Sequence, residues 1–456
     1  MFVNRTRELA QLATWWSSPS GRLAVVWGRR RVGKTALIRH FSQDLRCITH
    51  TGAGRAAPAE LRMLARQAEQ HAAAGVRDLH ARPFTDWDDA LDHLALLAAD
   101  EPVLLVLDEF PELAASSPEL PNVLRAFLER SMGLTQLRIV LCGSAVRYMR
   151  NLGEERRPLY GRMDLSLQVH PFAPWEAALL LPELSAQDRA LVYGLLGGVP
   201  LYLSWWDQNG TVEENLTVLA GQPGARLLTE GELVLATESE AGDFPAMVLH
   251  AIAAGATKHS EIKDAIGAEP TRTLDRLVSL RLVEKMRPVT EPEGTKRKLY
   301  RISDQFLYFY LGILQRYRTE IDAGLGPSIM PVIRERLDQH LGPVWESAFR
   351  QHLRRLGARG ELGGQIVAVG SFWTADGQNE IDAVVLAGIT RTPVLIGEAK
   401  WARQVDGPRR AADLRRKLAA LPGVRDEPRL ALAARESVRS APDGALVVTA
   451  ADIFSD

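Results

Sequence analysis

The chain has 456 residues, of which 46% are hydrophobic, and its 55 basic and 56 acidic side chains leave a formal net charge of -1. This length predicts about three domains with ample cores, and the balanced charge argues neither for nor against nucleic acid as a partner. The two cysteines, Cys47 and Cys142, disfavour a disulfide framework and a cysteine-based zinc site. Because the chain starts without a signal-peptide pattern and no apolar run approaches the ~20 residues that cross a bilayer, we expect a cytoplasmic protein without membrane contact.

The first predicted domain, residues 1–175, alternates short apolar runs with helical patterns, which is typical of a parallel α/β sheet. Its predicted strands are residues 23–27, 47–50, 103–107, 137–142 and 166–169. Directly after the first of them, residues 28–35 read Gly-Arg-Arg-Arg-Val-Gly-Lys-Thr, the P-loop signature. Its glycines let the backbone wrap a phosphate with N–H groups pointing inward at a helix N-terminus.

The P-loop predicts a nucleotide site. We expect Lys34 to reach the β- and γ-phosphates and Thr35 to ligate Mg²⁺. The other residues expected to line the nucleotide are Gly28, Arg29, Arg30, Arg31, Val32, Gly33 and Ala36. Because the loop uses backbone N–H groups for phosphate, the three arginine side chains are expected to face solvent or a partner. A chance glycine-rich turn is the alternative, and a second motif argues against it.

That second motif is an apolar run, residues 103–107, followed by Asp108 and Glu109. Five apolar residues without alternation predict a strand buried on both faces of a parallel sheet. Asp108 is expected to hold the Mg²⁺ shell, and Glu109 to orient or deprotonate the attacking water. A surface carboxylate at a strand end is the alternative for Glu109. ATP and Mg²⁺ are therefore the expected cofactors, and ATP hydrolysis is the expected reaction.

Four further segments resemble motifs of archaeal-type ATPases in the AAA+/STAND clan. They are residues 2–9, similar to the adenine-side box, residues 141–144, similar to sensor 1, and residues 158–162 and 197–203. The resemblance implies that Arg5 lies near the nucleotide and Ser144 near the γ-phosphate. It also implies that Arg162 is an arginine finger, acting across a homo-oligomer, or an intramolecular sensor. A surface or lid salt bridge is the alternative for Arg162.

The middle of the chain is predicted to hold two small domains. Residues 176–238 have helical patterns and would form a lid on the ATPase. Residues 239–322 resemble a winged helix, with helical patterns at 247–253, 260–266 and 271–280 and a hairpin of 282–287 with 298–302. DNA contact and mere packing against the ATPase remain equally open for this block; the cations that would contact DNA are Arg272, Arg276, Arg281, Lys296, Arg297 and Lys298. Residues 324–331, rich in glycine and proline, are predicted to be a linker.

The last predicted domain, residues 335–456, carries Asp382 and then, after fifteen intervening residues, Glu398-Ala399-Lys400. Glu398 and Lys400 share one strand face, and Asp382 would lie on the neighbouring strand, so the two carboxylates could ligate one Mg²⁺. This segment resembles the PD-(D/E)xK nuclease core, and Glu346, on a helix at 344–353, matches its helix-borne glutamate. Asn379-Glu380-Ile381-Asp382 departs from the literal Pro-Asp of that signature. A half-buried hairpin with exposed charges and a catalytically silent nuclease fold are the alternatives.

The sequence thus predicts an α/β protein: a P-loop parallel sheet with a helical lid, a winged helix and a small α/β nuclease-like domain. The leading hypothesis is an ATPase that couples nucleotide state to a tail that binds or cleaves DNA or RNA. Glu346, Asp382, Glu398 and Lys400 would meet around one cation, with the Asp382 and Glu398 carboxylates within about 5–6 Å of each other. The competing hypotheses are a signalling ATPase with a silent tail and a nucleotide-gated transcription regulator.

Overall fold

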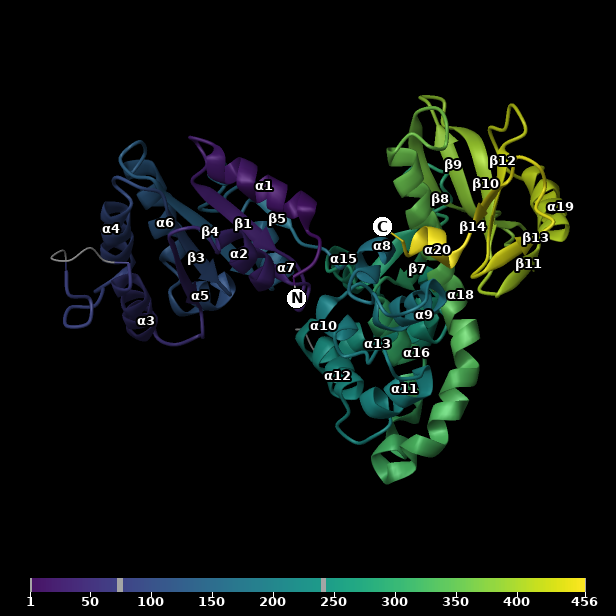
Figure 1. Ribbon diagram of the computed structural model, residues 1–456, viewed down its shortest axis with the longest axis horizontal. Helices are drawn as coiled ribbons and strands as arrows, with labels where there is room; N and C mark the ends of the chain where they lie inside the picture. Colours follow the sequence, from purple (N-terminus) through teal and green to yellow (C-terminus); the bar gives the residue numbers. More distant parts are fainter. Residues whose placement is uncertain (1, 72–76, 239–242, 456) are drawn as a thin grey trace. The chain divides into compact units, whose positions relative to one another are not determined.

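The computed structural model describes residues 2–71, 77–238 and 243–455. The chain divides into two compact units, Met1–Pro171 and Phe172–Asp456, and each is described by itself (Figure 1). The border predicted at residue 239 lies outside the described residues.

The first unit is built on a parallel five-stranded sheet in the order β2-β3-β4-β1-β5. Its strands are β1 (Leu23–Trp27), β2 (Cys47–Thr51), β3 (Val103–Asp108), β4 (Leu137–Gly143) and β5 (Leu165–Gln168). Each predicted strand is confirmed to within one residue at either end. Because β1 pairs with both β4 and β5, the segment that follows β1 leaves the sheet from an interior position.

Helices cover both faces of this sheet, which explains why its strands lack alternation. On one face Leu23 and Val25 share a core with residues of α3 (Ala57–Glu69), α4 (Trp87–Leu97), α5 (Phe110–Ser116), α6 (Leu120–Arg130) and α7 (Val146–Asn151). On the other face Ala24 and Val26 pack with residues of α1 (Thr6–Ser17) and α2 (Lys34–Ser42). This two-sided burial fixes the strand ends from which the site residues project.

The second unit begins with helices and continues into the three-helix block that the sequence predicts. The first helices are α8 (Pro174–Ala178), α9 (Ala186–Leu196), α10 (Pro200–Leu203), α11 (Val212–Ala220) and α12 (Arg226–Glu238). The block consists of α13 (Asp243–Ala253), α14 (His259–Ile266), α15 (Thr271–Ser279) and the antiparallel pair β6 (Val283–Met286) and β7 (Leu299–Ile302). After it come α16 (Gln305–Gly312), a 3₁₀ turn (Leu314–Tyr317) and α17 (Arg318–Glu320).

The linker predicted at residues 324–331 is wrong, because these residues are helical. A π-helical turn (Ile321–Leu325) leads into α18 (Gly326–Ala358), a helix of 33 residues. Gly324 supplies the positive φ, 86°, at the kink between them. A Cβ at Gly326 would lie 1.8 Å from the carbonyl oxygen of Gly221, so only glycine permits this helix–helix approach. Pro327 then occupies the first turn of α18, where proline is tolerated.

The C-terminal part of the second unit holds a mixed sheet in the order β14-β12-β10-β9-β8. Its strands are β8 (Ile366–Trp373), β9 (Glu380–Ala387), β10 (Thr392–Ala399), β12 (Arg429–Ala433) and β14 (Leu446–Val448). Neighbours among β8, β9 and β10 are antiparallel, whereas β10, β12 and β14 are parallel. The remaining elements are β11 (Gln404–Asp406), α19 (Gly407–Leu418), β13 (Ser437–Arg439) and α20 (Ala450–Ile453).

Two helices sandwich this C-terminal sheet. A Cβ at Gly397 would lie 2.8 Å from the Phe349 ring, so α18 packs directly on β10. The neighbouring residue Ile396 instead shares a core with Ala411 and Leu414 of α19. Successive strand residues point to opposite faces, so α18 and α19 lie on opposite sides. The whole chain is therefore an α/β protein with a P-loop parallel sheet and a small C-terminal sheet domain.

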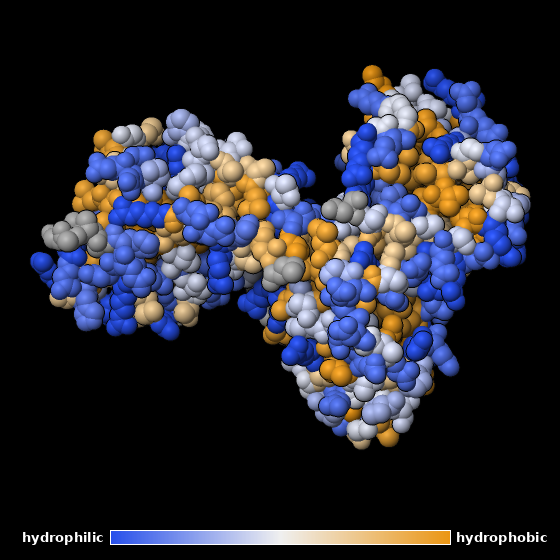
Figure 2. All heavy atoms as spheres, in the orientation of Figure 1, coloured by the Kyte–Doolittle hydropathy of each residue, from blue (hydrophilic) through white to orange (hydrophobic). Residues whose placement is uncertain are grey.

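None of the helices in the described ranges is both long and apolar enough to cross a membrane. Hydrophilic and hydrophobic residues are interspersed over the visible face of each unit (Figure 2).

Candidate functional site

The P-loop of the first unit connects β1 to α2. Arg31 and Gly33 have positive φ values of 69° and 92°, which turn the backbone back toward the start of α2. A Cβ at Gly28 would lie 2.3 Å from the carbonyl oxygen of Val169, so the loop passes too close to the end of β5 for any side chain. This is the compact glycine-dependent turn that exposes backbone N–H groups to a phosphate.

Lys34 opens α2 and its side chain stays inside the loop. The Nζ atom donates to the carbonyl oxygens of Gly28 and Arg29, each at 2.9 Å. Burial lowers the pKa of Lys34, against the attraction of Cys142, Glu109 and Asp108. These two carbonyl bonds hold the ammonium group where an incoming phosphate oxygen can replace them.

A chain of hydrogen bonds joins Thr35 to the ends of β3 and β4. The Thr35 Oγ1 donates to Asp108 Oδ2 at 2.9 Å, and the Glu109 backbone N–H donates to Asp108 Oδ1 at 3.0 Å. The Ser144 Oγ donates to Glu109 Oε2 at 3.0 Å. The structure therefore brings together four of the residues that the sequence singled out.

This arrangement fits Mg²⁺, which prefers hard oxygen ligands and retains several waters. The Thr35 hydroxyl and the buried Asp108 carboxylate lie side by side, so they would hold the cation beside the phosphates. Glu109 adopts the left-handed region, with φ 47°, which turns its carboxylate away from the strand toward Ser144. When bound, the cation would neutralise phosphate charge.

Arg5 reaches the same loop from the N-terminal segment. Its Nη2 donates to the Val32 carbonyl oxygen at 2.7 Å, and its Nη1 pairs with Glu8 Oε1 at 3.0 Å. Arg5 is buried, so it supports the P-loop backbone from within the protein. The P-loop arginines differ in exposure: Arg30 is exposed, whereas Arg29 and Arg31 are half-buried.

Arg162 lies at the other edge of the sheet. It precedes β5, whose first residue, Leu165, pairs with Ala24 near the start of β1, whereas the P-loop follows the end of β1. The Arg162 Nη2 contacts Glu129 Oε1 of α6 at 3.0 Å, and both side chains are exposed. The structure therefore does not bring Arg162 to the P-loop of its own unit, which disagrees with an intramolecular sensor in this arrangement.

In the second unit, Asp382, Glu398 and Lys400 converge as predicted. The Lys400 Nζ lies 3.4 Å from Asp382 Oδ2 and 2.9 Å from Glu398 Oε1. The Ala399 backbone N–H also donates to Asp382 Oδ2 at 2.9 Å, which fixes this carboxylate against β10. Burial, together with the charge of Glu398, raises the pKa of Asp382.

The sequence reasoning missed Lys417 of α19. Its Nζ lies 2.9 Å from Glu398 Oε2, so each oxygen of Glu398 contacts one lysine. Burial opposes ionisation of Glu398, but hydrogen bonds from Lys400 and Lys417 lower its pKa. Within the described ranges, no three histidine, cysteine, aspartate or glutamate side chains are placed to hold a metal ion. Nothing in the spacing of a basic helix distinguishes Lys417 from its neighbours, so only the fold reveals it.

Glu346 of α18 lies apart from the other three predicted residues in its contacts. Its Oε2 is 3.8 Å from Arg301 of β7 and 3.9 Å from Arg350, one turn along α18. Burial, and then the charge of Asp382, raise the pKa of Glu346 to about 7. The charge of Asp382 therefore acts on Glu346, but the side chains that contact Glu346 are Arg301 and Arg350, which the sequence reasoning missed.

The hairpin of the three-helix block contacts the C-terminal sheet. The Val289 backbone N–H donates to the Ser371 carbonyl oxygen of β8 at 2.9 Å. Arg297, one of the cations expected to meet DNA, donates to the Trp373 carbonyl oxygen at 3.4 Å and also contacts Glu291. The Arg297 side chain is thus occupied within the protein, whereas Lys296 and Arg272 are exposed.

A glycine-rich turn, a buried lysine, and an aspartate–glutamate pair at the adjacent end of a parallel sheet define a Walker-type P-loop ATPase unit. Comparison with known families agrees. Residues 2–205 match, and belong to, the family described as an ATPase domain predominantly from Archaea. Residues 310–412 match a second family, described as archaeal and bacterial proteins of unknown function.

Two relatives and two solved structures are similar to parts of this chain that differ in length. An uncharacterized protein of Methanocaldococcus jannaschii is 24% identical over 413 residues, which is 88% of each chain. An uncharacterized ATP-binding protein of the same organism is 48% identical over 44 residues, 10% of this chain and 75% of that one. Among solved structures, a Walker-type ATPase of Pyrococcus abyssi has a TM-score of 0.54 at 20% identity and covers 68% of this chain and 96% of its own. The ORC2 protein of Aeropyrum pernix, in ADPNP and ADP complexes, has a TM-score of 0.46 at 16% identity, with coverage of 72% and 96%.

Proposed function

We propose that this protein is a Mg²⁺-dependent ATPase whose phosphate and metal site is formed by the P-loop and by the ends of β3 and β4. The observation that carries the proposal is the chain of hydrogen bonds from Thr35 through Asp108 and Glu109 to Ser144. Thr35 and Asp108 would hold Mg²⁺, and Lys34 would contact the β- and γ-phosphates. Glu109 would orient or deprotonate the attacking water, with Ser144 fixing its carboxylate.

The test separates binding from turnover. Lys34→Ala should abolish ATP binding, because the phosphate contact is lost. Glu109→Gln should bind ATP and lose phosphate release, because the metal ligands remain and the water-orienting group does not. The control is Glu112→Gln, an exposed carboxylate three residues further along the chain. Equal turnover in Glu109→Gln and the unaltered protein would remove Glu109 from the mechanism.

We further propose that the C-terminal domain binds or cleaves nucleic acid at Asp382, Glu398 and Lys400. The Lys400 ammonium group lies within 3.4 Å of both the Asp382 and the Glu398 carboxylates, which supports this proposal. Two carboxylates can share one divalent cation, and a lysine can stabilise the charge of a phosphate. Glu346 would complete the set from α18. The resemblance to PD-(D/E)xK nucleases points to the same chemistry.

One observation favours the alternative, a catalytically silent tail on a signalling or regulatory ATPase. Lys417 takes the second oxygen of Glu398, so two lysines already balance the two carboxylates. When buried carboxylates already have an equal number of ammonium groups beside them, no metal ion is required to balance their charge.

Cleavage assays on the full chain decide between these candidates. The substrates are single- and double-stranded DNA and RNA with Mg²⁺ or Mn²⁺. Asp382→Asn should lose cleavage, whereas the exposed loop variant Asp376→Asn should retain it. Metal-dependent cleavage that survives Asp382→Asn would refute the site. If the protein binds nucleic acid without cleaving it, the domain is a binding module. If it neither binds nor cleaves nucleic acid, the signalling ATPase is the better candidate.

We also propose two partner surfaces that follow from the sequence. The three-helix block and its hairpin would act as a winged helix, with the exposed Arg272 and Lys296 as phosphate contacts. Arg162, which is exposed and remote from its own P-loop, would act at the nucleotide site of a second copy in a homo-oligomer.

A further inference from the structure

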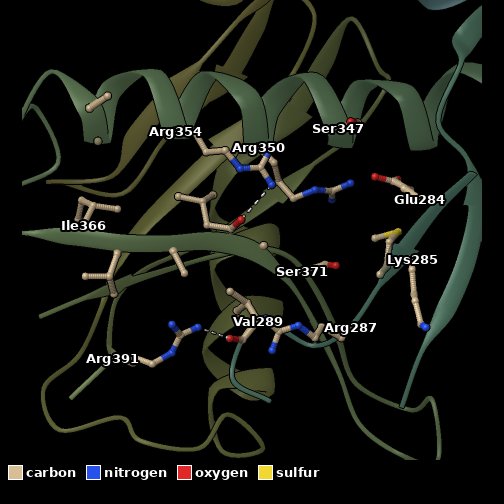
Figure 3. Close-up of a pocket in the computed structure, with 17 residues that line it drawn as sticks. Glu284, Lys285, Arg287, Val289, Ser347, Arg350, Arg354, Ile366, Ser371 and Arg391 are labelled. Atoms are coloured by element: carbon tan, nitrogen blue, oxygen red, sulfur yellow. Dashed lines mark hydrogen bonds between the residues drawn. The ribbon is translucent and has the colours of Figure 1, made fainter. Parts of the chain in front are cut away.

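Cationic side chains line a cavity in the second unit; among them Arg350 is buried, whereas Lys285, Arg354 and Arg391 are exposed. The cavity measures about 660 Å³ and is bounded by β6 and the residues after it, by α18 and by β8 (Figure 3). Five cationic side chains line it and one carboxylate, Glu284, faces them. The cations are Lys285, Arg287, Arg350, Arg354 and Arg391.

Backbone carbonyls hold two of these arginines without neutralising them. The Arg354 Nη2 donates to the Val369 carbonyl oxygen at 3.0 Å, and the Arg391 Nη2 donates to the Val289 carbonyl oxygen at 2.9 Å (Figure 3). No described carboxylate lies within ion-pair distance of either guanidinium. Each keeps further N–H donors for a ligand, because a guanidinium carries five.

Arg350 lies deepest among the five cations. It is only 5% exposed, and its Nη1 donates to the Asp382 carbonyl oxygen at 2.8 Å. Its ion pair with Glu346, at 3.9 Å, is long. The two outer cations have long, exposed pairs as well, Lys285 with Asp275 at 3.9 Å and Arg287 with Glu293 at 3.7 Å. The exposed partners of Lys285 and Arg287 stabilise these pairs little, so these two cations, together with Arg354 and Arg391, remain available to an anion.

We propose that this cavity binds a small phosphorylated molecule that carries two or more negative charges. Arginine forks match the oxygens of a phosphate group in two-point contacts. An excess of four positive charges over the single lining carboxylate favours a phosphate or diphosphate group over a monocarboxylate. The proposal goes beyond the functions proposed above, although Arg350 also contacts Asp382 and Glu346 of the C-terminal site.

The shape of the cavity distinguishes a small molecule from a nucleic acid. A volume of about 660 Å³ lies within the 300–1,000 Å³ that small-ligand pockets occupy. Arg350 is almost without solvent exposure, so the stiff backbone of a duplex would not reach it. A compact anion would bind at Arg354 and Arg391, with Arg350 one turn from Arg354 on α18.

Calorimetric titration of the full chain with pyrophosphate tests the proposal. All proteins carry Lys34→Ala, so that binding at the P-loop does not mask the second site. Arg354→Gln and Arg391→Gln should each weaken pyrophosphate binding by about tenfold or more, because each removes charge-assisted hydrogen bonds. The matched control is Arg429→Gln, which removes another arginine bonded to a backbone carbonyl, that of Gly444, in the same sheet. Its affinity should equal that of the Lys34→Ala parent.

Three results would overturn the proposal. The first is unchanged pyrophosphate affinity in both pocket variants when their melting temperatures match the parent. The second is an equal loss in Arg429→Gln, which would mean diffuse charge attraction. The third is binding of duplex DNA at this cavity, lost in Arg354→Gln, with no saturable binding of pyrophosphate. Arg391→Lys, which keeps the charge and loses the fork, should fall between the parent and Arg391→Gln.

Discussion

Replacing Lys417 by methionine tests whether the charge cluster of the C-terminal domain is a closed ion-pair network or a metal site. Lys417 and Glu398 are 2.9 Å apart, and their side chains are only 18% and 5% exposed. The loss of a charge-assisted bond to a buried carboxylate costs about 1.5–3 kcal/mol. We expect Lys417→Met to lower the free energy of unfolding by this amount, since Lys400 still pairs with the other oxygen of Glu398.

A neighbouring ion pair provides the matched control. Arg415 lies on the same helix and contacts Glu427 at the same distance, 2.9 Å, but these side chains are 53% and 61% exposed. Arg415→Met should therefore cost less than about 1 kcal/mol. Urea unfolding of the full chain, followed through the transition of the second unit, measures both variants. Equal costs would refute the argument that burial makes the Lys417 pair strong.

Manganese adds the functional arm of this experiment. If Asp382 and Glu398 form a metal site that Lys417 occupies, Mn²⁺ should restore the stability of Lys417→Met. At one hundred times the dissociation constant, binding restores about 2.7 kcal/mol. Arg415→Met should not respond beyond the unaltered protein. No recovery at any Mn²⁺ concentration would support the silent tail.

Three further predictions concern other parts of the chain. Ser144→Ala should lower ATP turnover about tenfold with ATP affinity retained, because Glu109 loses the 3.0 Å hydrogen bond that orients it. Phosphate release under saturating ATP measures this turnover, and an unchanged rate would exclude Ser144 from the mechanism. If Arg162 acts on a second copy, turnover per chain should rise with protein concentration, and mixing the Arg162→Ala and Glu109→Gln proteins should recover activity. If both effects are absent, Arg162 serves only as the partner of Glu129. Burial lowers the pKa of His340 from 6.5 to about 4, so its protonation favours the unfolded state, and the stability present above pH 6.5 is lost as the pH falls toward 4. At pH 5 this loss is about 2 kcal/mol, and His340→Phe, which preserves the stack on Tyr308, should reduce the pH dependence of unfolding by that amount, whereas the exposed His80→Gln should not.

The sequence predicted that the P-loop and the acidic residues after β3 lie together, because the information for this arrangement is local. The P-loop spacing, the strand before it and the acidic pair after β3 each lie within a few residues. Parallel strand ends then meet at one edge of a sheet by geometry. The convergence of Asp382 with Glu398 and Lys400 was predictable for a similar reason, since the hairpin register places Ala383 opposite Gly397.

The failures have a different physical origin. Residues 324–331 look like a linker because glycine and proline usually break helices. Here Gly326 allows the close approach to Gly221, and Pro327 lies in the first turn of α18. The contacts of Glu398 with Lys417 and of Glu346 with Arg301 join residues 19 and 45 positions apart, and no periodicity specifies which cation of many will pair. Long-range ion pairs therefore decide what Asp382, Glu398 and Lys400 can do.

The two carboxylate sites differ in charge balance, and this difference bears on where a metal ion binds. In the P-loop unit, the ammonium group that acts on Asp108 and Glu109 is that of Lys34, so the proposed site would keep a negative charge for Mg²⁺. In the C-terminal domain, Asp382 and Glu398 contact two ammonium groups, so the cluster is balanced before any cation arrives. A divalent cation there must displace a lysine or bring its own anion. If the domain is a nuclease, Mn²⁺ should therefore bind the protein much more tightly when an oligonucleotide is present than when it is absent. The phosphates of the oligonucleotide would pair with the lysine that Mn²⁺ displaces.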